Sequence, residues 1–130
     1  MDVPRYARSS RYLRAGFPII VLIALGIYSA SPRPTHNQIT LKAVAADARL
    51  LMAAHPVRAT QDWIYIPKDQ WPSAIAKLNP EFVTVGYGTV DITTKPFLDG
   101  GWGYGFAIDD RHLEKCWSKL GHGMFWHNPC

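Results

Sequence analysis

The sequence has few of the residues on which disulfide-rich or highly charged proteins depend. Two of its 130 residues are cysteine, 18% carry a formal charge, and 48% are hydrophobic. This composition is ordinary for a folded domain and excludes a disordered chain. The sequence also lacks a phosphate-binding glycine loop, a nucleophile elbow, a metalloprotease helix motif and a calcium-binding loop. These absences remove the enzyme classes that short motifs identify.

Excess positive charge is confined to a leader of 14 residues. The whole chain has a net charge of +4, of which residues 1–14 contribute +3 and the remaining ten basic and nine acidic side chains contribute +1. Binding to nucleic-acid phosphates needs a cluster of lysine and arginine side chains. We therefore expect no nucleic-acid partner. The charged residues of the leader are Arg5, Arg8, Arg11, Arg14 and Asp2.

An apolar run without a charged residue extends from Ala15 to Ala30. A basic leader followed by such a run is typical of a secretory signal or an uncleaved signal anchor, with the leader on the cytoplasmic side. These sixteen residues would rise about 24 Å as a helix, somewhat less than a bilayer core of ~30 Å.

We expect a transmembrane signal anchor over residues 15–31 that binds the lipid bilayer, with a cleaved signal peptide or a buried cytoplasmic helix as alternatives. The expected location is the bacterial inner membrane, crossed once, with a cytoplasmic N-terminus. The part after the anchor would then be periplasmic or extracellular.

After the anchor, two prolines in residues 32–39 predict an extended linker. Residues 40–130 are expected to form a small α+β domain with one amphipathic helix, one short helix and a three- or four-stranded antiparallel sheet. From Thr40, apolar residues spaced three or four apart predict the amphipathic helix, with Thr40 or Asn37 as its cap and Pro56 as its end. The apolar face of this helix consists of Leu41, Val44, Ala45, Ala48, Leu51 and Met52.

Short β-prone segments and proline-bounded turns follow. Residues 63–66 end at Pro67 and predict a strand near the edge of a sheet. Pro72 suits the first turn of a short helix that Pro80 stops. Residues 82–85 and 89–93 alternate around a glycine-containing turn, which predicts a β-hairpin.

Large and small residues alternate strictly between positions 102 and 108. Such alternation predicts a strand with one aromatic face and one nearly bare face. The aromatic face either serves as a stacking platform for a ligand or covers the core, with the glycines under a packed helix. We expect the second arrangement, because small domains need large apolar side chains in their cores. The large residues are Trp102, Tyr104, Phe106 and Ile108, and the small ones are Gly103, Gly105 and Ala107.

The order of motifs between Gln70 and Ile108 supports the same fold. Residues 71–80 read Trp-Pro-x-Ala-Ile-x-x-Leu-x-Pro, and the hairpin and the aromatic-glycine strand follow. In this order the segment resembles a recurring group of small uncharacterised bacterial proteins. The resemblance implies the fold of the segment and supplies no activity, substrate or catalytic residue.

Cysteines and histidines gather near the C-terminus. In an oxidising compartment, two cysteines fourteen positions apart favour a disulfide between Cys116 and Cys130. A zinc or copper site formed by Cys116, His122, His127 and Cys130 is the alternative, although the chain has no Cys-x-x-Cys pair. A catalytic thiol with a histidine base is the third interpretation.

These patterns contain no recognisable catalytic set. We therefore expect a non-catalytic module for binding or assembly in the bacterial cell envelope, without a cofactor and with a protein partner there. The alternative function is metal handling, with zinc or copper bound by the C-terminal cysteine and histidine cluster.

Overall fold

The computed structural model describes residues 31–98, 100–113 and 115–130 of the chain. The chain divides into two compact units, Met1–Ser31 and Pro32–Cys130, and the fold described here is that of the second unit. The expected basic leader and signal anchor lie outside the described residues, apart from Ser31. None of the described helices is long and apolar enough to cross a membrane.

Helix α2 spans Gln38–Ala54 and begins two residues before the expected start at Thr40. Asn37 caps it, because its Oδ1 atom accepts hydrogen bonds from the backbone N–H groups of Ile39 and Thr40 at 3.0 and 3.2 Å. Such a cap satisfies donors that have no partner within the first turn. The predicted apolar face is confirmed, with Met52 partly buried and the other members buried: Leu41, Val44, Ala45, Ala48 and Leu51.

Within the described residues, six strands form one sheet in which all neighbours pair antiparallel, in the order β1-β2-β3-β4-β6-β5. The α+β class is as expected, but the expected count of three or four strands is wrong. The sheet is larger because the C-terminal segment adds a hairpin of two strands. The strands are β1 Trp63–Ile66, β2 Phe82–Gly86, β3 Thr89–Phe97, β4 Gly100–Ala107, β5 Trp117–Gly121 and β6 Met124–His127.

The added hairpin turns at His122 and Gly123, where the backbone has positive φ angles of 57° and 78°. A two-residue turn with positive φ at both positions matches the right-handed twist of its flanking strands. From the sequence we expected a cluster of cysteines and histidines in this segment, and we did not expect strands β5 and β6. The edge strand β1, in contrast, lies where the sequence predicts it.

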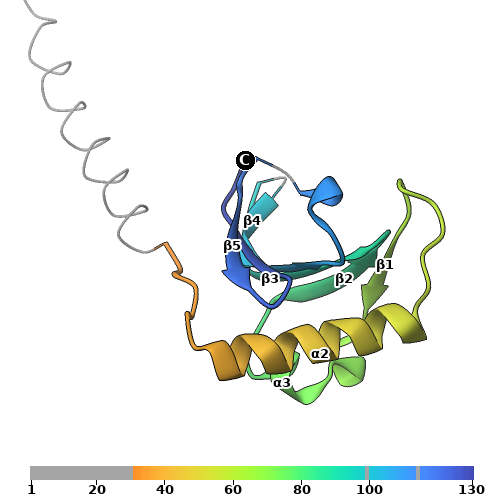
Figure 1. Ribbon diagram of the computed structural model, residues 1–130, viewed down its shortest axis with the longest axis horizontal. Helices are drawn as coiled ribbons and strands as arrows, with labels where there is room; N and C mark the ends of the chain where they lie inside the picture. Colours follow the sequence, from red (N-terminus) through yellow and green to blue (C-terminus); the bar gives the residue numbers. More distant parts are fainter. Residues whose placement is uncertain (1–30, 99, 114) are drawn as a thin grey trace, which may run out of the picture. The chain divides into compact units, whose positions relative to one another are not determined.

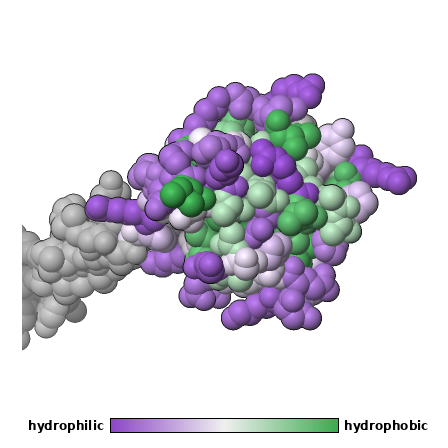
Figure 2. All heavy atoms as spheres, turned by 60° about the horizontal axis from the view of Figure 1, so that its bottom comes forward, coloured by the Kyte–Doolittle hydropathy of each residue, from purple (hydrophilic) through white to green (hydrophobic). Residues whose placement is uncertain are grey.

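Helices α2 and α3 (Ser73–Ala76) lie on one side of the sheet, opposite the C-terminus (Figure 1). Asp47 of α2 links the two helices, because its Oδ2 atom accepts the backbone N–H groups of Ala74 and Ile75 at 2.7 and 3.3 Å. Figure 2, which brings this side forward, shows strongly hydrophobic spots separated by hydrophilic surface. Two exposed apolar side chains of α2, Ile39 and Leu50, contribute to its mixed outer face.

The core lies between α2 and the sheet face that it covers. From β4 the side chains of Trp102, Tyr104 and Phe106 are buried there, which confirms that the aromatic face belongs to the core. Ile108 differs from the expectation, because it follows the end of β4 and is 61% exposed. The other sheet residues of the core are Ile66, Val83, Val85, Val90, Ile92, Met124 and Trp126.

Candidate functional site

The sheet face opposite α2, called the open face below, has a strip of backbone without side chains along β4. A Cβ atom at Gly103 would collide with the Ile92 carbonyl oxygen, and one at Gly105 would lie 2.5 Å from an atom of the Trp117 ring. A side chain therefore fits at neither position. The glycines lie under aromatic rings of β5 and β6, so the expectation that a helix covers them is wrong.

Strands β5 and β6 place these rings by simple alternation. Met124 and Trp126 of β6 enter the core, so Phe125 and His127 point to the open face. Trp117 is paired with His127 across the two strands, and their rings stack with centroids 5.5 Å apart and planes inclined by 24°. The Trp117 ring thus lies over Gly105 and the His127 ring lies beside Gly103.

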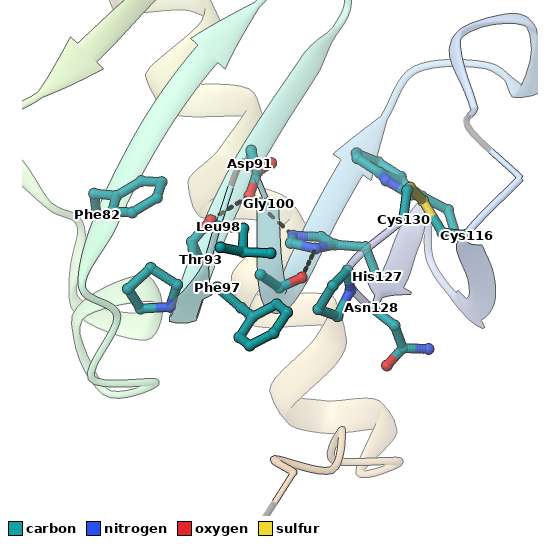
Figure 3. A pocket seen from close by; sticks show the side chains of 14 residues that line it. Phe82, Asp91, Thr93, Phe97, Leu98, Gly100, Cys116, His127, Asn128 and Cys130 are labelled. Carbon is teal, nitrogen blue, oxygen red and sulfur yellow. Dashed lines mark hydrogen bonds and ion pairs between the residues drawn. A yellow bond between two sulfur atoms is a disulfide. The ribbon is translucent and has the colours of Figure 1, made fainter. Parts of the chain in front are cut away.

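His127 is held by oxygen acceptors at both ring nitrogens. Its Nδ1 atom lies 2.9 Å from the Gly101 carbonyl oxygen, and its Nε2 atom lies 3.0 Å from Oδ1 of Asp91 (Figure 3). A carbonyl oxygen only accepts, so Nδ1 carries a hydrogen. An ionised carboxylate also only accepts, so with Asp91 ionised Nε2 carries one too. The pair is then an imidazolium–carboxylate ion pair, with the His127 side chain 7% exposed.

A cavity of about 590 Å³ opens beside this pair. Phe82 stands on one side of it and the Cys116–Cys130 pair on the other, with Asp91 and His127 between them (Figure 3). The two cysteines lie at disulfide distance, with Cα atoms 5.7 Å apart. The remaining walls are mostly apolar and include Pro96, Phe97, Leu98 and Pro129.

A second cavity of about 410 Å³ shares Asp91 and Trp117 with the first. We call the two cavities together the groove, and name them the disulfide cavity and the Asp62 cavity. Among the described residues, Asp62 is the second carboxylate that lines the groove, and Trp63 and Tyr87 add aromatic surface to the same cavity. The polar residues of the Asp62 cavity also include Thr60, Gln61, Thr84 and Thr89.

The candidate metal ligands do not come together as a set. Cys116 and Cys130 pair with each other, and His127 uses both ring nitrogens on Asp91 and Gly101. His122 is exposed in the turn between β5 and β6. In the part of the chain that the structure describes, no group of three or more histidine, cysteine, aspartate or glutamate side chains could hold a metal ion. The pairing of the cysteines also leaves no thiol for the expected catalytic alternative.

Asp91 and Trp117 are residues of the groove that the sequence did not identify. Asp91 alternates with Val90 and Ile92, which enter the core, so its position in β3 points to the open face. This alternation in β3, together with the glycines of the neighbouring strand β4, is the sequence signal that identifies Asp91. Trp117 carries no comparable signal, because β5 has only five residues and an irregular register. Comparison of the chain with protein-family models, with curated proteins and with solved structures finds no match.

Proposed function

We propose that this protein is a non-catalytic binding module of the bacterial cell envelope that takes a ligand in the groove of its open face. The observation that carries the proposal is the disulfide cavity, with its apolar walls around the polar Asp91–His127 pair. Its volume of about 590 Å³ falls within the ~300–1,000 Å³ typical of ligand pockets. Its mixture of apolar walls and a few fixed polar groups is also typical of such pockets.

The chemistry of the cavity favours binding over catalysis. Of the described residues that line it, Thr93 alone has a hydroxyl group. That hydroxyl donates to Oδ1 of Asp91 at 3.1 Å, rather than to a ring nitrogen of His127. Nucleophilic catalysis needs a nucleophile within hydrogen-bond reach of its base. The Asp91–His127 pair therefore has a structural role, in which it holds two side chains that line the cavity in place.

The membrane location in this proposal is supported by the sequence and by the cysteines. The four arginines before Ala15–Ala30 favour an anchor in the inner membrane, with the domain on the periplasmic or extracellular side. Disulfides form and persist in oxidising compartments. A cysteine pair at disulfide distance suits that side of the membrane.

A fragment screen on the full-length chain in lipid nanodiscs tests the binding function, with empty nanodiscs as the blank. Ligand-observed NMR should find neutral or charged aromatic fragments that bind the protein. Phe97→Ala removes a wall of the disulfide cavity at a 41% exposed position, and should weaken their binding about tenfold, equivalent to ~1.4 kcal/mol.

Ile108→Ala is the matched control, because Ile108 is exposed and outside the residues that line the groove. It should leave the affinities unchanged. A screen without hits, or hits equally insensitive to both substitutions, would contradict the proposed function.

A further inference from the structure

The two cavities of the groove differ in chemistry. The disulfide cavity is walled by Phe82, Phe97, Leu98 and the cysteine pair, whereas the Asp62 cavity is lined mostly by polar and aromatic side chains. Asp91 and Trp117 line both cavities. An elongated ligand that fills both must therefore have an apolar part and a polar part.

Negative charge dominates the Asp62 cavity. The described residues that line the groove include Asp62 and Asp91 but neither lysine nor arginine. Asp62 forms no ion pair with the described part of the chain. Nε2 of His127 and the hydroxyl of Thr93 both contact Oδ1 of Asp91, and no hydrogen bond within the described residues uses Oδ2. The Asp91 side chain is 38% exposed, so part of it is accessible to a ligand.

One cation beside this end of the groove, Arg111, is already paired. Arg111, which interacts electrostatically with Tyr87, donates from Nη2 to Oδ2 of Asp109 at 2.6 Å. This hydrogen bond and the attraction of the Asp109 carboxylate raise the pKa of Arg111. The positive charge of Arg111 is therefore balanced by Asp109 within the loop after β4. Asp62 remains available to a cation from outside.

Aromatic rings surround the same carboxylates. Trp63, Tyr87 and Trp117 line the Asp62 cavity, and Trp63 is 67% exposed. The face of an aromatic ring attracts a cation by ~0.5–1 kcal/mol at exposed sites. Carboxylates beside aromatic rings attract ammonium groups, which carry only hydrogen-bond donors, and disfavour phosphates and carboxylates.

We propose that the groove binds a small organic cation, an ammonium group on an apolar body. The ammonium group lies against Asp62 and Asp91 in the Asp62 cavity, and the apolar body contacts Phe82 and Phe97 in the disulfide cavity. This inference rests on the proposed binding function and adds the chemical class of the ligand.

Three probes of one size test the charge preference: 2-phenylethylamine, 2-phenylethanol and phenylacetate. Their affinities are measured by ligand-observed NMR on the full-length chain in nanodiscs. The amine should bind about tenfold more tightly than the alcohol, which corresponds to ~1.4 kcal/mol, and phenylacetate should bind more weakly than the alcohol.

Substitutions of Asp62 test whether this residue causes the preference for the amine over the alcohol. Asp62→Asn should weaken binding of the amine about tenfold and leave the alcohol unchanged, and Asp62→Glu should restore the preference. Asp69→Asn is the matched control, because Asp69 is an exposed aspartate outside the lining of the groove, and it should change nothing. Far-ultraviolet circular dichroism checks that each variant is folded.

The outcomes separate the two proposals. If the amine and the alcohol bind equally, with binding that Phe97→Ala weakens, the cation inference is wrong and the binding function stands. The cation inference is also wrong, and the binding function again stands, if Asp62→Asn and Asp69→Asn have equal effects on the amine. If no probe binds and no fragment binds in the screen, both proposals are wrong.

Discussion

Replacement of both Cys116 and Cys130 by alanine removes the link between the start of β5 and the last residue of the chain. The two cysteines are 14 positions apart and enclose the β5–β6 hairpin. A cross-link of this kind lowers the conformational entropy of the unfolded chain. For a closed loop of about 15 residues, the loop-entropy relation gives ~3 kcal/mol at 25 °C.

This loss is large for a domain of this size. Native domains are stable by about 5–15 kcal/mol, so the double variant loses about a fifth to three fifths of the total. For a domain of ~100 residues, each kcal/mol shifts Tm by about 4–8 °C, which predicts a decrease of ~12–24 °C. The slope of the free energy of unfolding against urea should increase, because the unfolded chain without the cross-link exposes more surface.

Urea unfolding of the detergent-solubilised full-length chain, followed by tryptophan fluorescence, measures both quantities. The oxidised wild type is compared with the reduced wild type and with the double variant, and reductant should shift only the wild type. Lys119→Ala is a control within β5, where it removes an exposed ion pair with Asp110 worth at most ~1 kcal/mol. Equal urea midpoints for the double variant and the oxidised wild type would refute the reasoning.

Two further predictions concern the open face. Gly103→Ala places a Cβ atom against the Ile92 carbonyl oxygen, a backbone atom, and should lower the free energy of unfolding by ~3 kcal/mol or more. Gly100→Ala meets its first neighbouring atom at 3.9 Å and should be tolerated; equal urea midpoints would show that the strip is not tightly packed. In ¹⁵N NMR spectra at neutral pH, His127 should show hydrogens on both ring nitrogens, and Asp91→Asn should leave only the one on Nδ1. A neutral ring in the wild type would rule out the ion pair.

Elements whose apolar pattern matches a single buried face were predictable from the sequence. The stripe from Leu41 to Leu51 identified α2 because one side of that helix covers the sheet. The β2–β3 hairpin was predictable because Val83 and Val85 alternate with more exposed residues. The predicted start of α2 at Thr40 is two residues too late. Asn37 and Thr40 both suit a helix cap, and only the structure shows which one accepts the hydrogen bonds.

The C-terminal hairpin was missed because its inner strand does not alternate in burial. All four residues of β6 are buried, with Met124 and Trp126 under α2 and Phe125 and His127 on the open face. A strand buried on both faces lacks the polar and apolar alternation that identifies a half-exposed one. The cysteines and histidines of this segment therefore suggested a chemical cluster rather than a pair of strands.

The polar centre of the groove depends on three strands being in one register, which no local pattern contains. Asp91 of β3 is opposite Gly105 of β4, and His127 of β6 is opposite Gly103 of the same strand. Neighbouring strands are ~4.8 Å apart, so β3 and β6 are separated by about 10 Å. The 3.0 Å contact between Asp91 and His127 therefore requires both side chains to lie across β4.

Any side chain at Gly103 or Gly105 would occupy the space in which the rings of His127 and Trp117 lie. The glycines of β4 are therefore a structural precondition for the Asp91–His127 pair. They let polar groups from two non-adjacent strands meet on the sheet surface, where Asp91 lines both cavities. The bare face predicted from the alternation in residues 102–108 is thus the feature that allows the groove to form.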